Sequence, residues 1–428
     1  MKFQNYWRRV EVAGTVHKVA ISAIICDAPA RAFLKCVKGH TGFYGCERCC
    51  QRGVYLNSKV VFNECDAELR TDDTFKNRNQ KDHHLANSPL ENIQNFGMVS
   101  QFPLDFMQQV CLGVMRRLLL HWIKGSNSCR LSPRERLGIS ERLNSIRNLT
   151  PSEFNRIPRG LDTVERWKAN EFRLFLLYTG PYAVSSYVKQ KLYDHFMILH
   201  VAIRILCSNE MAVGHCEYAK QLLHSFVSAM TMNYGPDSVV YNIHNLIHTA
   251  DDVKFMSAPL QDFSCFPFEN MLGQIKRIIR TANNPLSQLT RRLAESNAMC
   301  LGEGSSGDLK VRRDPLTGKV FEVSNKEITL STCKDKNAYV MLKDKRVLRI
   351  EEMHFSERDS QLSDLVLVGP VFKYYENYFI YPCESSKLSI FKAWDISASV
   401  DSVMFVNIYK KCFVIPKGNH FIVYPLLH

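Results

Sequence analysis

The spacing of apolar residues changes once along the chain, from a helical to a strand-like pattern. This change is the sequence feature that most limits which folds the chain can adopt. From about Leu104 to Thr249 apolar residues recur at three-to-four spacing, as in LDFMQQVCLGVMRRLLLHWIKG, which ends at Gly125. After Gly318 the segments YVMLKDKRVLRIEEM, LSIFKAW and VMFVNIYKKCFVIPKGNHFIVYP have the composition and turns of strands. The sequence therefore predicts an α+β chain, in which a long helical region precedes a small β domain.

Capping signals place helix boundaries inside the helical region. SPRE at 132–135 and TPSE at 150–153 have the spacing of capping boxes with proline at the first helical position. Another helix is expected to begin near Asp237 and to carry His244 and His248. The remaining helices are expected at about 169–178, 183–207 and 213–232, and from Glu269 onward.

The segment HKVAISAIICDAPARAFL, at residues 17–34, predicts a strand followed by a helix. Its first half is apolar and β-branched, which is typical of a buried strand. Asp27 falls at the end of that half, and Pro29 suits the first turn of a helix. A loop rich in Gly and Cys, KGHTGFYGCERCCQRG, follows.

The charge of the chain favours a polyanionic partner. Its formal net charge is +13, and nucleic acid is the commonest partner of such a basic protein. The alternative is a basic protein that has no such partner. No run of about 18 uncharged apolar residues occurs, so we expect no membrane-spanning helix. The 15 cysteines come without a secretory signal, which favours a reducing compartment and one metal site over a disulfide scaffold.

Four residues have the spacing of metal ligands. Cys46 and Cys49 form a CxxC inside a glycine-flanked loop, and His244 and His248 lie four apart on one helical face. A tetrahedral Cys2His2 zinc site needs two thiolates held by a tight turn and two imidazoles pointing the same way. The alternatives are two buried thiols and two histidines on a polar helix face.

Two carboxylates stand out by their positions. Asp27 ends the expected strand, and Glu269 begins a helix whose face continues through Gly273, Lys276 and Arg280. A metal-holding carboxylate on that face would be followed by cations suited to phosphate. The simpler alternatives are that Asp27 caps the helix at Pro29, and that Glu269 complements the positive end of its own helix.

The order of these features resembles that of the CACTA-like DDE transposases, which cut and paste DNA. An Asp, a CxxC, a long helical region, an HxxxH and a Glu follow one another, as they also do in the related recombinase that rearranges antigen-receptor genes. Transposase-derived proteins of invertebrate genomes are similar in further phrases. These are WKANEFRLFLLYTGP (167–181), YNIHNLIHTADDV (241–253), FPFENMLGQIKRIIRTANNPLSQLTRRL (266–293) and the C-terminal KCFVIPKGNHFIVYPLLH.

The resemblance implies a role for each of the singled-out residues. Asp27 would be the second acid and Glu269 the third acid of a DDE triad that binds Mg²⁺ or Mn²⁺. Structural Zn²⁺ would join the CxxC to the HxxxH. The implied partner is DNA and the implied location is the nucleus, and the chain could also form a homo-oligomer. Cations expected to contact DNA are Lys276, Arg277, Arg280, Arg291 and Arg292, with Lys310, Arg312 and Arg313 in a linker.

The resemblance also implies a division of the chain. An incomplete RNase H-like core would be interrupted by a large all-α insertion and followed by the β domain. Its parts are expected at 1–60 (partial core with the CxxC loop), 61–236 (helical insertion), 237–301 (HxxxH and acidic helix), 302–318 (linker) and 319–428 (β domain).

The sequence departs from the family pattern at the first acid. In the two-metal enzymes of this fold the first acid lies on the first strand, roughly a hundred residues before the second acid. In this sequence no aspartate precedes Asp27, and Glu11 is the sole acidic residue before it. We therefore expect the remnant of a transposase, inactive as a nuclease by itself. The alternatives are a domesticated DNA- or chromatin-binding protein that does not catalyse, and a zinc-stabilised protein-interaction protein that does not bind nucleic acid.

Overall fold

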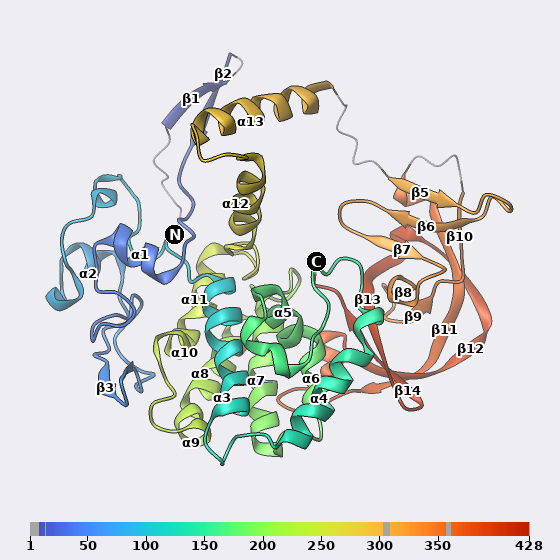
Figure 1. The fold of residues 1–428 in the computed structure, drawn as a ribbon, viewed down its shortest axis with the longest axis horizontal. Coiled ribbons are helices and arrows are strands. Elements are labelled where there is room, and N and C mark those ends of the chain that lie inside the picture. The colour runs from blue at the N-terminus through green and yellow to red at the C-terminus, as the bar shows by residue number, and fades with distance from the viewer. Residues whose placement is uncertain (1–7, 13, 303–308, 357–360, 428) are drawn as a thin grey trace. The chain divides into compact units, whose positions relative to one another are not determined.

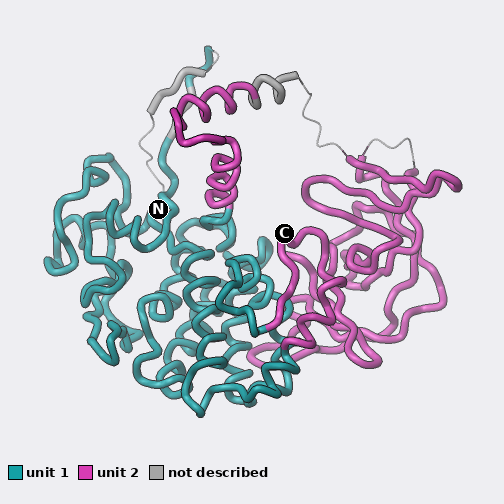
Figure 2. Tube along the Cα trace, viewed as in Figure 1, with its two compact units in different colours: residues 1–139, 161–266 teal, residues 140–160, 267–428 magenta. Residues whose placement is uncertain are grey.

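The computed structural model describes residues 8–12, 14–302, 309–356 and 361–427. It is a mixed α/β structure that divides into two compact units, coloured separately in Figure 2. Unit 1 contains residues 1–139 and 161–266, and unit 2 contains residues 140–160 and 267–428. The two units do not follow the five predicted parts, because a piece of the predicted helical insertion belongs with the β domain.

Unit 1 begins with short hairpins and loops. Strands β1 (Arg8–Val12) and β2 (Thr15–Val19) pair around Gly14, and β3 (Val54–Leu56) pairs with β4 (Lys59–Val61). Among the described residues of unit 1 these hairpins are the only sheets. The predicted RNase H-like core, with its inserted helices, is therefore not confirmed by this arrangement.

The strand predicted over the first half of residues 17–34 was wrong in its extent. It ends at Val19, and residues 20–27 have no regular secondary structure. A strand needs a partner for its backbone groups, and β2 pairs only with β1. The backbone of residues 20–27 is held instead by Gln101, whose side-chain nitrogen donates to the carbonyls of Ile21 and Ser22.

The helical part of unit 1 agrees closely with the predicted periodicity. The first long element runs from Phe106 to Lys124, as a π-helix and then α3 (Arg116–Lys124), and it ends at Gly125 as expected. Helix α7 (Gln190–Leu206) packs against α8 (Cys216–Ser228), and α8 packs against α11 (Leu246–Met256) (Figure 1). The other helices of this unit are α1 (Ala28–Lys35), α2 (Asp72–Lys76), α5 (Ala169–Leu174), a second π-helix (Phe175–Thr179), α6 (Gly180–Val184), α7 (Gln190–Leu206), α8 (Cys216–Ser228), α9 (Met230–Tyr234), α10 (Tyr241–His244) and α11 (Leu246–Met256).

Unit 2 contains an antiparallel β domain whose strand pairings close into a ring. Neighbours pair in the order β12, β14, β13, β8, β9 and β11, and β11 also pairs with β12, so these six strands form a closed path. Strands β10, β6 and β5 extend the sheet from β11, and β7 pairs with β6. The bounds are β5 (Lys310–Arg313), β6 (Val320–Ser324), β7 (Thr329–Ser331), β8 (Tyr339–Leu342), β9 (Val347–Arg349), β10 (Glu352–Phe355), β11 (Leu365–Asn377), β12 (Phe391–Met404), β13 (Ile408–Lys417) and β14 (His420–Pro425).

The predicted strands and the turn before β14 are confirmed, and part of the predicted linker is a strand. Gly418, in the predicted KGN turn, has a φ of +60° and joins β13 to β14. Residues 310–313 form β5 instead of linker, with Arg312 paired to Glu322. Unit 2 also holds α12 (Phe266–Ile278) and α13 (Pro285–Gly302), apart from the first residue of α12.

Residues 140–160, which include the end of α4 (Pro133–Ser145), belong to unit 2 and make a buried ion pair there. Lys411 donates to both carboxylate oxygens of Glu153 at 2.8 and 2.7 Å, and to the carbonyl of Thr329 at 2.6 Å. Burial, partly opposed by Glu153, lowers the pKa of Lys411 to about 8. The capping box predicted at 150–153 is therefore wrong, because Glu153 turns to Lys411 and no helix forms there. The box predicted at Ser132 is confirmed by its two reciprocal hydrogen bonds.

We expect Lys411→Met to destabilise unit 2 by about 3–5 kcal/mol, because it leaves the Glu153 carboxylate buried without its cation. Hydrogen exchange of the β13 amides or urea unfolding measures the loss. The matched control is Lys373→Met, which breaks a half-exposed pair with Asp395 and should cost less than about 1 kcal/mol. Equal costs for the two variants would contradict a structural role for the buried pair.

His200 makes the stability of unit 1 depend on pH. It is fully buried on α7, its Nδ1–H donates to the carbonyl of Leu176 at 2.7 Å, and burial lowers its pKa to about 3. The folded unit therefore excludes a proton that the unfolded chain binds below its ordinary pKa of 6.5. The stabilising contribution is complete above that value and is lost as the pH falls from 6.5 towards 3.

We expect wild-type unit 1 to lose about 1 kcal/mol more stability than His200→Gln between about pH 6 and pH 5. Chemical unfolding at the two pH values, followed by helical circular dichroism, measures the difference. His215→Gln, which changes an exposed histidine, should keep the wild-type pH slope. An unchanged slope in His200→Gln would show that His200 does not cause the acid sensitivity.

Candidate metal centre

Two short segments of unit 1, far apart in the sequence, form a cluster of four ligands. Cys46, Cys49, His244 and His248 are all buried, and one ligand atom from each lies within 4.8 Å of the others. The two Sγ atoms are 3.5 Å apart, Cys49 Sγ lies 3.2 Å from His244 Nε2, and Cys46 Sγ lies 3.8 Å from His248 Nε2. This buried Cys2His2 cluster can hold a metal ion such as zinc.

The spacings fit a tetrahedral ion. With Zn–S bonds of about 2.3 Å and Zn–N bonds of about 2.0–2.1 Å, the edges of a tetrahedral site measure about 3.3–3.8 Å. The three contacts between ligand atoms fall in or just below that range. The alternatives of two unrelated thiols and of a polar histidine face both fail, since all four side chains are buried and meet at one point.

The thiol loop is shaped by closely spaced glycines. Gly42 N–H donates to the carbonyl of Gly39, and Gly45 N–H donates to that of Gly42, so the chain makes two tight turns before Cys46. A side chain at Gly45 would place its Cβ 2.5 Å from the Gly39 carbonyl oxygen, which excludes any larger residue. Past the turns, the backbone N–H groups of Arg48 and Cys49 point at Cys46 Sγ, at 3.5 and 3.4 Å.

The thiol of Cys46 is polarised towards its ionised form. Burial alone would raise its pKa, but the hydrogen bond from Cys49 and the neighbouring His244 and His248 outweigh burial and lower the pKa well below its ordinary value. A thiolate is the form of cysteine that binds metals. The electrostatics of the loop therefore agree with its geometry.

The two histidines are presented by a helical turn that differs slightly from the prediction. Helix α10 ends at His244 and α11 begins at Leu246, with Asn245 between them in a right-handed conformation. Because the backbone stays helical, the imidazoles keep their i, i+4 relation, and their ring centres are 5.3 Å apart. The predicted N-cap at Asp237 was wrong, since Asp237 pairs with Lys59 and lies outside both helices.

The two residues between the cysteines bind the loop to distant helices. Glu47 is buried and accepts from Arg31 at 3.2 Å, from Lys35 at 2.9 Å and from the Tyr241 hydroxyl at 3.0 Å. Burial opposes its ionisation, but Lys35 and Arg31 prevail and hold the pKa of the Glu47 carboxyl well below its usual range. Glu47 thus connects the metal loop to α1 and, through Tyr241, to α10.

Arg48 makes the corresponding connection to α11. Its guanidinium pairs with Asp252 at 2.8 Å and donates to the carbonyls of Val99 and Phe102. Asp252 also accepts from the backbone N–H of Leu104 at 2.8 Å. These supporting contacts were not predicted, because charged residues inside a CxxC carry no sequence signal of burial.

The two predicted catalytic residues belong to different units of the structure. Asp27 is the N-cap of α1, and its Oδ1 accepts from the N–H of Ala30 at 2.8 Å, as the simpler alternative expected. Glu269 is exposed in the first turn of α12. Asp27 belongs to unit 1 and Glu269 to unit 2, so a shared divalent ion stays a prediction.

Four of the predicted DNA-contacting cations lie on α12 and α13, Arg280 lies between these helices, and the other three lie on β5. Helix α12 buries none of its side chains, and Lys276, Arg277 and Arg280 are exposed. On α13, Arg291 and Arg292 lie near Glu295, at 3.0 and 3.9 Å.

No helix in the described part of the chain is long and apolar enough to cross a membrane.

Comparison with known proteins gives one match. The sequence model of a family described as "Domain of unknown function (DUF8592)" matches residues 309–426. This range begins just before β5 and ends just after β14, so it covers the β domain and less than half of the chain. No curated protein and no solved structure matches the chain.

We expect the purified chain to hold one zinc ion, bound by Cys46, Cys49, His244 and His248. The double variant Cys46→Ser, Cys49→Ser should lose it, because serine does not supply the thiolates of the site. Elemental analysis by mass spectrometry measures the content. Cys333→Ser, Cys383→Ser removes two cysteines outside the cluster and should keep the ion. Zinc retained by the first variant, or absent from the wild type, would refute the site.

Proposed function

We propose that this chain is a DNA-binding protein, the remnant of a cut-and-paste DDE transposase of the CACTA-like kind, whose unit 1 is stabilised by structural zinc. The observation that supports it most is the buried Cys2His2 cluster. It joins a CxxC to an HxxxH 195 residues further along the chain, and the resemblance in motif order pairs these same two motifs.

Zinc at this cluster would have a structural role. All four ligands come from the protein and all are buried, and a closed four-ligand shell is the mark of structural zinc, whereas catalytic zinc keeps one position open. The ion would fasten the thiol loop to α10 and α11. Glu47 and Arg48 would orient the loop through the buried contacts they make to the same helices.

Binding to DNA is supported by charge and exposure. The net charge of +13 favours a polyanion. Lys276 and Arg277 are exposed on α12, a helix that buries no side chain, and Arg280 is exposed just after it. Cations of this kind neutralise phosphates without reading sequence. A DNA partner implies that the chain works in the nucleus.

The transposase ancestry does not by itself supply catalysis. A two-metal centre needs carboxylates that share their ions. One carboxylate oxygen of Asp27 accepts a hydrogen bond that caps α1, and Glu269 extends from the exposed first turn of α12. Neither position alone holds a pair of Mg²⁺ or Mn²⁺ ions, so the proposal concerns DNA binding and leaves strand cleavage aside.

A second candidate function is that of a zinc-stabilised protein-interaction or chromatin protein. Helices α12 and α13 favour it, because they expose apolar side chains together with their cations: Phe268 is 50% exposed, Leu272 58% and Leu286 77%. Apolar surface on amphipathic helices is typical of contacts between proteins, including copies of one chain. A homo-oligomer stays a prediction.

We expect the chain to bind duplex DNA with an affinity that falls steeply with salt. Replacing Lys276, Arg277 and Arg280 by Gln should flatten the slope of log K against log salt by up to about 3, at about 0.9 per lost phosphate contact. Fluorescence anisotropy of a labelled duplex over a salt series measures the slope.

The control variant carries Lys319→Gln, Lys373→Gln and Lys392→Gln. It removes the same net charge from lysines that pair with Glu352, Asp395 and Glu376 in the β domain, so its slope should change less. Equal changes in both variants would exclude α12 as the contact. Absence of DNA binding at low salt would refute the proposal and leave the interaction protein.

A further inference from the structure

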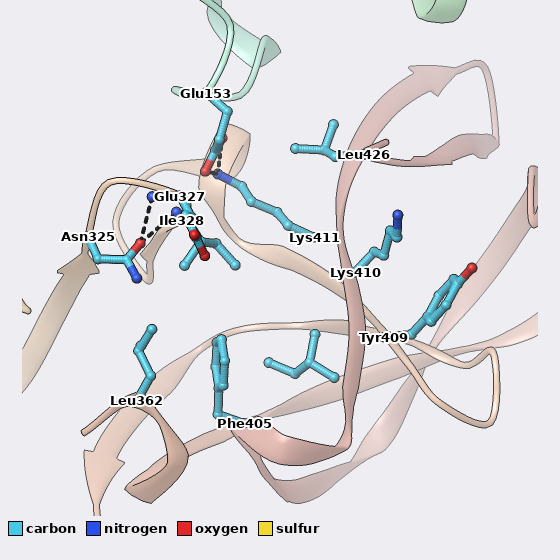
Figure 3. A pocket seen from close by; sticks show the side chains of 11 residues that line it. Glu153, Asn325, Glu327, Ile328, Leu362, Phe405, Tyr409, Lys410, Lys411 and Leu426 are labelled. Atoms are coloured by element: carbon cyan, nitrogen blue, oxygen red, sulfur yellow. Dashed lines mark hydrogen bonds and ion pairs between the residues drawn. The ribbon is translucent and has the colours of Figure 1, made fainter. Parts of the chain in front are cut away.

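The β domain has a cavity that no proposed role of the chain uses. It measures about 300 Å³ and lies wholly within unit 2 (Figure 3). This volume is at the lower end of ligand pockets and suits one bulky side chain. We call it the β-domain cavity, and its lining residues are Glu153, Asn325, Glu327, Ile328, Leu362, Phe405, Ile408, Tyr409, Lys410, Lys411 and Leu426.

Part of the cavity wall is apolar and continuous with the domain core. Ile328, Leu362, Phe405 and Ile408 pack against the buried cluster formed by residues such as Leu365. Figure 3 shows Leu362 and Phe405 side by side on one wall. An apolar group that enters the cavity would therefore replace water on surfaces that already adjoin the core.

The buried ion pair closes one side without adding charge. Lys411 donates to Glu153, to the carbonyl of Thr329 and to Oδ1 of Asn337, and Glu153 also accepts from the N–H of Thr329. The charges of Glu153 and Lys411 cancel, and their polar atoms are engaged with each other. This side holds the shape of the cavity and leaves its selectivity to the apolar walls and the rim.

Lysines lie at the rim of the cavity. Lys410 is a lining residue, and Lys326 is exposed next to the lining residues Asn325 and Glu327 in the sequence. Lys343 donates its backbone N–H to Asn407, directly before Ile408, and Lys345 Nζ lies 3.7 Å from the centre of the Tyr409 ring. Lys410, and Lys345 against the lining residue Tyr409, place positive charge beside the cavity.

Apolar surface continues outside the mouth. Met404 is 43% exposed and Val406 49% exposed, on either side of the lining residue Phe405. An apolar recess with an apolar margin and a lysine rim complements a peptide that alternates apolar and acidic residues. The negative charge of such a peptide also complements the net charge of +13 of the chain, which attracts acidic partners over a long range.

We propose that the β-domain cavity binds an acidic peptide segment of another protein, with one bulky apolar side chain in the cavity and flanking carboxylates facing the lysine rim. The site is independent of the zinc centre and of the cations of α12. The β domain would recruit a protein partner, whatever the other unit binds.

The test uses the full chain and a short fluorescein-labelled peptide that carries a single leucine flanked on both sides by aspartates and glutamates. We expect saturable binding by fluorescence anisotropy. A peptide with the leucine replaced by alanine, and one with the acids replaced by their amides, should each bind about tenfold more weakly, the loss typical of an interface hot spot. Equal binding of the alanine peptide would overturn the proposal, because the cavity would then contribute nothing.

Two variants locate the site. Leu362→Trp should fill the cavity and weaken binding about tenfold, and Lys410→Gln should weaken it by a few-fold. The matched controls are Leu316→Trp, at a fully exposed turn outside the cavity, and Lys373→Gln on the β11–β12 hairpin. Circular dichroism checks that each variant is folded. Binding that survives Leu362→Trp would refute the peptide site. Binding that unlabelled duplex DNA and the alanine peptide abolish equally well would also refute it, and would assign the lysines to a nucleic acid.

Discussion

The meeting of two thiols with two imidazoles is the contact on which the structure of unit 1 depends. Hairpins, short helices and loops make up its described residues up to about 100, and they bury only a small apolar cluster that includes Ala32, Val37 and Phe75. The thiol loop brings this part of the chain to α10 and α11, almost two hundred residues further on. A metal ion at that point would add to the stability that this small cluster supplies, as in small zinc-dependent folds.

Buried charge strengthens the same junction. Glu47 and Arg48 lie between the two cysteines, and each is paired inside the protein with groups of opposite charge. A pair of this kind adds little net stability, because desolvation offsets most of the attraction, but the loss of one partner is costly. Such pairs fix which segments meet. The loop is therefore positioned twice, by its ligands and by the two charged residues between them.

How far the sequence predicts this structure depends on how local each signal is. The clustering of Cys46, Cys49, His244 and His248 was predicted correctly. The CxxC turn and the i, i+4 pair each form within a few residues, and the order of motifs in the resemblance implied that the two pairs meet. The contacts of Glu47 were missed, since its partners Arg31 and Tyr241 lie in different parts of the chain. The strand predicted before Asp27 was wrong for the same reason: apolar, β-branched composition shows that a segment suits a sheet, but it does not supply a neighbouring strand. Asp27 then remains with the role available to it locally, the capping of α1.

Glu153 shows how a local signal loses to a distant one. Its sequence context, TPSE, favours a capping box whose value is about 1 kcal/mol. In unit 2 the same carboxylate is buried with Lys411, which lies 258 residues away, and it also accepts from the backbone of Thr329. Leaving Lys411 buried without a counter-ion would cost several kcal/mol, which outweighs the capping box.

The pair of Glu153 and Lys411 has a consequence beyond stability. The same pair closes one side of the β-domain cavity, so the segment at 140–160 completes a surface whose other walls all come from the family-matched range 309–426. A β domain of this type that lacks such a segment would have its buried lysine exposed and its cavity open on that side, and its binding surface would differ from the one described here.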